Sequence, residues 1–160
     1  MNLYCCQLDI QWEDKKANFA KVRSMLASAK PEKEALVLLP EMFATGFSMN
    51  VAAIAEKERS VTENFLSETA RQFGIFLMGG IVTEGKLGRG RNEAVLFSPT
   101  GDLVARYCKL QPFTLGGESQ NYLAGDEIVV GSYKALRTLK PEAQIKVDNS
   151  APKKTDDQQS

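Results

Sequence analysis

Apolar and polar segments alternate along the chain in a way that predicts five strands. Leu3 to Ile10 begins the series, and the continuous apolar run from Ala35 to Leu39 is typical of a strand covered on both faces. Pro99-Thr100-Gly101-Asp102 has the composition of a turn and joins the last two strands as a hairpin. The predicted strands cover residues 3–10, 35–39, 75–82, 92–98 and 103–109.

Two helices are predicted between the first three strands. Asp14 can cap the first helix, which ends near Pro31. Ser60 and Glu63 form a capping box for the second helix, and Gly74 closes it. Apolar residues recur at helical spacing in both. The residues expected to face inward are Phe19, Val22, Met25, Leu26 and Ala29 in the first helix, and Val61, Phe65, Leu66, Thr69 and Phe73 in the second.

The order βαβαβββ predicts an α/β fold with a mixed sheet and helices packed on one face. The other face of the sheet must then be covered by something else. The segment from Gly85 to Gly90 is rich in glycine, but no Gly-Lys-Ser/Thr follows, so a flexible hairpin tip is favoured over a phosphate-binding loop.

Composition narrows the class of protein. Lys plus Arg and Asp plus Glu both total 20 among 160 residues, so no charge excess favours nucleic acid or an anionic membrane surface. No apolar stretch reaches membrane-spanning length, and the first strand, interrupted by Gln7 and Asp9, does not resemble a signal peptide.

The absence of histidine excludes Ser-His-Asp catalysis and any zinc site with a histidine ligand. No metal or cofactor is predicted.

The three cysteines favour a reducing compartment, and hence a cytoplasmic location. Cys5 and Cys6 are adjacent and would point to opposite faces of a strand, which makes them a poor disulfide pair.

Residues 131–160 differ in character from the rest. Periodicity is lost from Pro141, and the last nine residues are polar, with the composition of a disordered tail. The predicted domain therefore covers residues 1–130, followed by a divergent polar tail over residues 131–160.

Two charged residues lie where predicted strands end. Glu41 follows the apolar run and Pro40, and Lys109 ends the last strand. Strand ends are where α/β folds place catalytic groups, so this pair suggests parts of an amide-hydrolysing site. Taken singly, each residue is more often a solvated surface residue.

Several separated segments, in order, resemble the nitrilase superfamily of carbon-nitrogen hydrolases, and within it the ω-amidases. The resemblance covers about residues 1–130 and implies the N-terminal half of an αββα sandwich. The segments that carry it are Gln7 in the first strand, Leu39-Pro40-Glu41-Met42-Phe43 with Thr45-Gly46-Phe47, Gly79-Gly80, Asn92 to Gly101, Tyr107-Cys108-Lys109, Gly117-Glu118 and Ala124-Gly125-Asp126.

The resemblance implies a Glu-Lys-Cys site that hydrolyses short 2-oxo acid ω-amides to the acid and ammonia. Glu41 matches the general base, Lys109 the catalytic lysine, and Glu118 a second glutamate that orients the site. Family members then continue with a strand that ends in the nucleophilic cysteine, whereas no cysteine follows Cys108 here. Leu110-Gln111-Pro112-Phe113 also departs from the more basic segment usual after the lysine.

None of the cysteines present is expected to replace the nucleophile. Cys108 should point away from Lys109 because side chains alternate along a strand, and Cys5 and Cys6 occupy a strand where small buried residues are expected. The chain is therefore expected to be truncated before its nucleophile and inactive alone.

Three interpretations remain open: an ω-amidase-like hydrolase that takes a small-molecule amide, an inactive fragment of such an enzyme, and a non-catalytic module that docks on intact subunits through its exposed sheet face. An uncovered apolar face also predicts self-association, so a homo-oligomer is among the assemblies left open.

Overall fold

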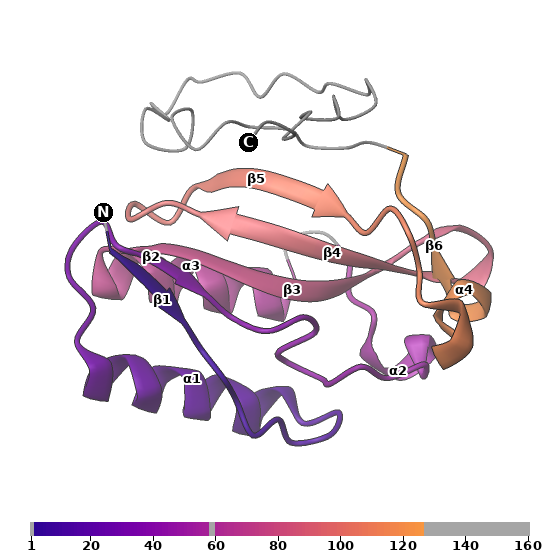
Figure 1. Ribbon diagram of the computed structural model, residues 1–160, viewed down its shortest axis with the longest axis horizontal. Helices are drawn as coiled ribbons and strands as arrows, with labels where there is room; N and C mark the ends of the chain where they lie inside the picture. Colours follow the sequence, from indigo (N-terminus) through magenta and orange to yellow (C-terminus); the bar gives the residue numbers. More distant parts are fainter. Residues whose placement is uncertain (1, 58–59, 127–160) are drawn as a thin grey trace, which may run out of the picture. The chain divides into compact units, whose positions relative to one another are not determined.

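The computed structural model describes residues 2–57 and 60–126, which form a single mixed sheet with helices (Figure 1). Six strands make up this sheet, in the order β1-β2-β3-β4-β5, with β6 paired to β4. The strands are β1 (Leu3–Cys5), β2 (Leu36–Leu38), β3 (Phe76–Glu84), β4 (Gly90–Phe97), β5 (Leu103–Cys108) and β6 (Tyr122–Leu123).

Strand direction follows from the connections. A helix returns the chain between β1, β2 and β3, so these strands are parallel, whereas β3-β4 and β4-β5 are antiparallel. The expected hairpin between the last two long strands is confirmed. Because of these strand directions, the end of β2, the start of β4 and the end of β5 lie at the same edge of the sheet.

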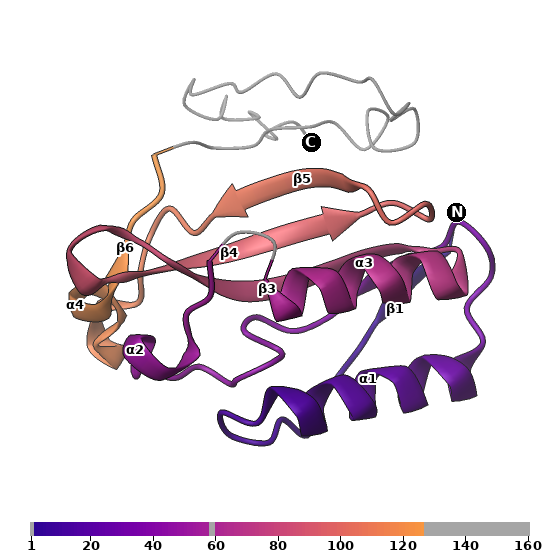
Figure 2. The ribbon, with the colours of Figure 1, turned by 180° about the vertical axis from the view of Figure 1, so that it is seen from behind.

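The helices are α1 (Lys15–Ala29), α2 (Val51–Ile54), α3 (Val61–Phe73) and α4 (Glu118–Asn121), with 3-10 turns at Lys86–Gly88 and Thr114–Gly116. Figures 1 and 2 show α1 and α3 side by side on one face of the sheet. The prediction of a mixed sheet with helices on one face is thus confirmed.

Local capping signals explain where the long helices begin and end. The Asp14 carboxylate accepts from the backbone N–H of Ala17 at 2.9 Å, and the Ser60 hydroxyl accepts from that of Glu63 at 3.2 Å. Gly74 ends α3 in the left-handed region, with φ 67°, which costs glycine little.

The core lies between α1, α3 and the helix-covered face of the sheet. An aromatic stack joins α1 to α3, since the Phe19 and Phe65 rings lie 4.1 Å apart between centroids. Fully buried residues of both helices and of the central strands surround it: Val22, Leu26, Val37, Leu66, Ala70, Leu77 and Val95.

Three expectations about the elements need correction. The first strand ends at Cys5 instead of Ile10, because β2, its partner, is itself only three residues long. Val61 was expected inside but is 66% exposed, since the buried stripe of α3 is centred on Thr62, Leu66 and Thr69, and Val61 lies at its margin in the first turn. Ala29, also expected inside, is exposed at the last residue of α1.

The third correction concerns β2, which was expected to be covered on both faces. Ala35, Val37 and Leu39 are buried on the helix side, whereas Leu36 and Leu38 are only half-buried. The sheet face opposite the helices also presents the exposed side chain of Leu3, which pairs with Leu36.

The predicted domain boundary at residue 130 and the polar tail from 131 lie outside the described residues.

Candidate active site

Glu41 is delivered by the turn that follows β2. The chain leaves the sheet after the Leu39 N–H donates to the carbonyl of Met78 at 2.8 Å, and Met42 then adopts a left-handed conformation with φ 47°. A non-glycine residue there costs on the order of 1–3 kcal/mol and persists only where surrounding contacts enforce it. Met42 is fully buried, so its side chain holds the turn, while Glu41 itself is exposed.

Gly80 allows this turn to pack directly against β3. A Cβ atom at Gly80 would lie 2.5 Å from the Met42 nitrogen and 2.7 Å from the Glu41 Cα. Both neighbours are backbone atoms, which cannot yield as a flexible side chain does. The sequence resemblance included Gly80 without a role; the structure shows that it sets the position of Glu41.

Lys109 follows β5 at the same edge of the sheet. Its backbone N–H donates to the carbonyl of Asn92 at 2.8 Å, which ties it to β4. Its Nζ atom donates to Glu41 Oε1 and to Glu118 Oε2, each at 2.9 Å. The ammonium also lies 5.2 Å from the centroid of the Phe47 ring.

Glu118 begins the short helix α4 and has a fully buried side chain. Besides Lys109, it accepts hydrogen bonds from the backbone N–H of Phe113 at 2.6 Å and from Asn92 Nδ2 at 2.7 Å. A buried carboxylate is tolerated because each of its oxygens has a donor.

The electrostatics agree with this pairing. Burial raises the pKa of the Glu118 carboxyl, but the donors Asn92, Phe113 and Lys109 outweigh it, so the pKa falls below its usual range. Burial likewise disfavours the charge on Lys109, but Glu41 and Glu118 outweigh it and raise its pKa. Lys109 and Glu118 are both charged at neutral pH.

The expectation that Glu41, Lys109 and Glu118 come together at one edge of the sheet is confirmed. Glu118 was expected in a loop or beside one; it lies at the start of a helical turn. The residue that sequence reasoning did not assign is Asn92, which is buried and contacts all three. The local sequence gives little signal for it, because its neighbours in β4, Arg91 and Glu93, are polar as well.

A cavity of about 750 Å³ opens beside Glu41 and Lys109. One oxygen of Glu41, Oε1, accepts from both Lys109 and Asn92, at 2.9 and 2.6 Å. Within the described part of the chain, Oε2 receives no hydrogen bond, and the Glu41 side chain is 49% exposed. The site therefore offers an anchored carboxylate with one open oxygen and a fixed positive charge. The remaining lining residues are Phe47, Gln111, Pro112, Phe113, Thr114 and Leu115.

The described residues place no cysteine in the lining of this cavity. Burial and the nearby charge of Glu93 raise the pKa of the Cys108 thiol, and burial raises that of Cys6. Both shifts disfavour the thiolate.

Over residues 2–57 and 60–126, no group of three or more His, Cys, Asp or Glu is arranged to hold a metal ion. No helix in these same ranges is long and apolar enough to cross a membrane.

The sequence matches the carbon-nitrogen hydrolase family over residues 4–145. It is 32% identical over 139 residues to an omega-amidase of Yersinia enterocolitica, covering 87% of this chain and 52% of that protein. It is 26% identical over 124 residues to 2-oxoglutaramate amidase of Bacillus subtilis, covering 77% of this chain and 48% of the relative. The chain thus spans about half the length of these curated relatives.

Solved structures give the same picture of the fold. A CN-hydrolase superfamily protein from Xanthomonas campestris, solved with an arsenic adduct in its active site, superposes with a TM-score of 0.70 at 28% identity, covering 82% of this chain and 49% of that one. An amidase from a Nesterenkonia species gives a TM-score of 0.69 at 18% identity, covering 83% of this chain and 54% of that one.

Proposed function

The chain belongs to the carbon-nitrogen hydrolase family, and we propose that it carries the acid–base and charge-stabilising part of an ω-amidase-type site that acts on short amides of 2-oxo acids. The observation that carries the proposal is Lys109 Nζ, 2.9 Å from both Glu41 and Glu118 at the mouth of a cavity. The similarity to omega-amidases supports the substrate class.

In this proposal Glu41 is the general base. Its open oxygen, Oε2, takes the proton of a thiol nucleophile, and the sulfur attacks the amide carbonyl carbon. The carbon–oxygen π electrons move to the oxygen, where the charge of Lys109 stabilises them; one such donor contributes about 3–4 kcal/mol in sites where it has been removed. Glu41 then returns the proton to nitrogen as the carbon–nitrogen bond breaks and ammonia leaves.

The resulting thioester is hydrolysed by water. Glu41 accepts one proton from that water as the new carbon–oxygen bond forms, the carbon–sulfur bond breaks, and Glu41 returns the proton to the departing sulfur, which leaves as the thiol. Glu118 keeps Lys109 in place through both steps without touching the reacting atoms.

We further propose that residues 1–160 alone do not turn over amides. The only cysteines in these residues are Cys5, Cys6 and Cys108, and neither the cavity lining nor the raised pKa values of Cys6 and Cys108 favour any of them as nucleophile. Attack by water activated by Glu41 would forgo covalent catalysis at the harder step.

Two measurements test the absence of turnover and the assignment of the site separately. We expect no ammonia release from short ω-amides, including 2-oxoglutaramate, above that of the Glu41→Gln variant. We also expect the chain to bind these amides, as followed by NMR shifts of the Asn92 side-chain amide, which is present in both proteins, with binding weakened in Lys109→Met. Glu84→Gln, which changes an exposed carboxylate at the end of β3, is the matched control for both experiments.

Turnover well above that of Glu41→Gln would overturn the inactivity proposal. An affinity for amides that is the same in the wild type and in Lys109→Met would overturn the assignment of the site.

A second candidate function is a non-catalytic module that docks on an intact subunit of the same family. Apolar side chains on the sheet face opposite the helices favour it, because Leu3 is 60% exposed and Leu36 and Leu38 are only half-buried. Sedimentation of the chain with and without an intact omega-amidase distinguishes this candidate: a mixed complex supports it, and independent sedimentation contradicts it.

A further inference from the structure

Asn92 connects every member of the Glu41–Lys109–Glu118 cluster. It lies near the start of β4, where its side chain is 4% exposed. Its backbone carbonyl accepts from the Lys109 N–H at 2.8 Å. Its side-chain Nδ2 donates to Glu41 Oε1 at 2.6 Å and to Glu118 Oε1 at 2.7 Å. A single residue of β4 therefore contacts groups from the β2 turn, the end of β5 and α4.

The chemistry of the amide suits this position. A primary amide nitrogen carries two hydrogens, and here each is directed to a different carboxylate. An ionised carboxylate can only accept, so the carbonyl end of the amide would repel both glutamates and the nitrogen must face them. The amide also adds no charge to a cluster that already contains two anions and one cation.

We propose that Asn92 is a positioning residue, which holds Glu41 and Glu118 on either side of Lys109 through its two N–H donors and so leaves Oε2 of Glu41 as the oxygen that receives the proton. The catalytic meaning of this arrangement rests on the proposed function, but the arrangement itself does not. Removal of the amide would leave Glu41 Oε1 with Lys109 as its donor, so the carboxylate would be held less firmly, and would leave buried Glu118 with Lys109 and the Phe113 N–H as its remaining donors.

A purely structural role for Asn92 predicts a different outcome. A buried amide that only completes packing would affect stability and leave the ionisation of its neighbours unchanged. The groups that act on Glu118 are Lys109, Asn92 and the Phe113 N–H, with Glu41 across the lysine and Tyr122 of β6 nearby. Burial, followed by the charges of Glu118 and Glu13, raises the pKa of Tyr122 to about 12, so this phenol stays neutral while Glu118 titrates.

The first experiment measures the titration of Glu118 and Lys109 by carbon-13 NMR in the full 160-residue chain. The variants are Asn92→Leu, which is close in volume and lacks both donors, and Asn92→Ser, which is smaller and less demanding to accommodate. We expect both to move the Glu118 midpoint upward, because a donor to the ionised form is lost.

Asn18→Leu is the matched control. Asn18 is also fully buried and its amide donates to two acceptors, the backbone carbonyls of Gln11 and Ala44, at 2.7 and 2.8 Å. We expect this variant to lower the melting temperature without moving the Glu118 midpoint. A folded Asn92 variant whose Glu118 midpoint equals that of the wild type would refute the positioning role.

The second experiment uses the wild-type chain and so does not depend on a variant that folds. Both Nδ2 protons of Asn92 should shift in step with the protonation of Glu118 and Glu41, because each is bonded to one of them. Resonances that stay constant through the carboxylate titration would overturn the inference. Neither measurement involves an amide substrate, so a failure of the proposed function, seen as no amide binding, is distinguishable from a failure of this one.

Discussion

The structure contains two clusters in which one cation lies between two glutamates, and both cations come from the same segment of chain. Arg106, within β5, pairs with Glu63 of α3 and Glu93 of β4. Lys109, one residue beyond the end of β5, pairs with Glu41 and Glu118. The two clusters have the same charges and nearly the same place in the sequence, but their surroundings differ.

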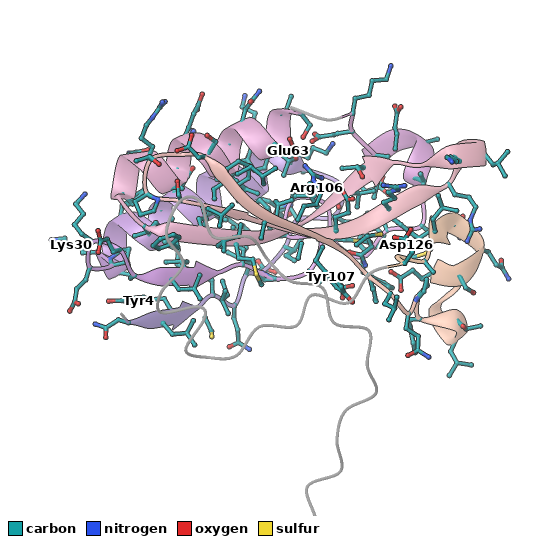
Figure 3. All side chains as sticks on the ribbon, turned by 90° about the horizontal axis from the view of Figure 1, so that it is seen from above. Tyr4, Lys30, Glu63, Arg106, Tyr107 and Asp126 are labelled. Atoms are coloured by element: carbon teal, nitrogen blue, oxygen red, sulfur yellow. The ribbon has the colours of Figure 1, made fainter. Side chains whose placement is uncertain are left out.

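Both carboxylates of the Arg106 cluster are buried, whereas the Arg106 side chain, 26% exposed, is about as accessible as that of Lys109 at 28%. Arg106 lies beside Glu63 between sheet and helix (Figure 3), and its other guanidinium nitrogen is 2.6 Å from Glu93. Glu93 also accepts from the Thr83 hydroxyl at 2.8 Å and is 4% exposed. A guanidinium cannot lose its proton in a protein, and its planar fork matches two fixed carboxylates. The cluster joins α3 to two strands of the sheet.

The Lys109 cluster is open on one side. Glu41 is 49% exposed and lines a cavity together with Lys109. An ammonium is a compact charge on a flexible stem, and here the surrounding carboxylates and Phe47 fix its position. The comparison shows that charge composition alone does not distinguish the two clusters. They differ in the exposure of Glu41 and in its Oε2, which has no donor among the described residues.

The largest effect is expected from removal of Arg106, because its two carboxylate partners are both buried. Arg106→Met leaves Glu63 and Glu93 close together without that charge, and breaking a buried pair in this way costs about 3–5 kcal/mol. Urea denaturation measures the loss in the free energy of unfolding. Lys109→Met is the comparison variant, and a larger loss in it than in Arg106→Met would contradict the distinction between the clusters.

The next effect concerns the support of Glu41. Gly80→Ala places a methyl group against the backbone of the Glu41 turn, and overpacking of this kind costs about 1–3 kcal/mol. Gly79→Ala is the matched control on the other face of β3, where the nearest atoms belong to the side chains of Phe43 and Leu66. Both variants should lower the melting temperature, but only Gly80→Ala should change the Lys109 and Asn92 side-chain resonances. Equal changes in both would refute the role assigned to Gly80.

Removal of the Lys109 ammonium should have a moderate effect on stability. Lys109→Met removes one charged donor from buried Glu118, which retains Asn92 and the Phe113 N–H, and a hydrogen bond to a charged group contributes about 1.5–3 kcal/mol. Urea denaturation should place this variant between the wild type and Arg106→Met. No measurable loss would show that Lys109 does not stabilise Glu118.

The smallest effect is on the pH dependence of stability. The pKa of Glu118 is lowered in the folded chain, so its stabilising contribution is complete above the unfolded value, about 4.3, and is lost as the pH falls through the lower folded value. Melting temperatures measured from neutral to acid pH should fall less steeply in Glu118→Gln than in the wild type. Parallel curves would show that Glu118 contributes nothing to acid unfolding.

Much of the fold could be predicted because the signals for it are local. Asp14, Ser60 and Gly74 act on backbone groups within a few residues of themselves, so the limits of α1 and α3 follow from sequence. One error arose because the length of a strand depends on its partner: β1 ends early since β2 is short. Another arose because the apolar stripe of a helix can extend beyond the part that the sheet buries, as it does at Val61. The short elements α2, α4 and β6 carry too few residues for a periodic pattern.

The sequence by itself determined the succession of the five long strands and two long helices along the chain, the family resemblance and the candidate residues Glu41, Lys109 and Glu118, because each rests on a run of neighbouring residues. Only the tertiary structure decided that Asn92 bridges the two glutamates, that Gly80 makes room for the Glu41 turn, and that one oxygen of Glu41 stays open. These features join atoms 26 to 51 residues apart along the chain. No local pattern encodes such contacts, since the geometry of the sheet alone brings those atoms within hydrogen-bonding distance.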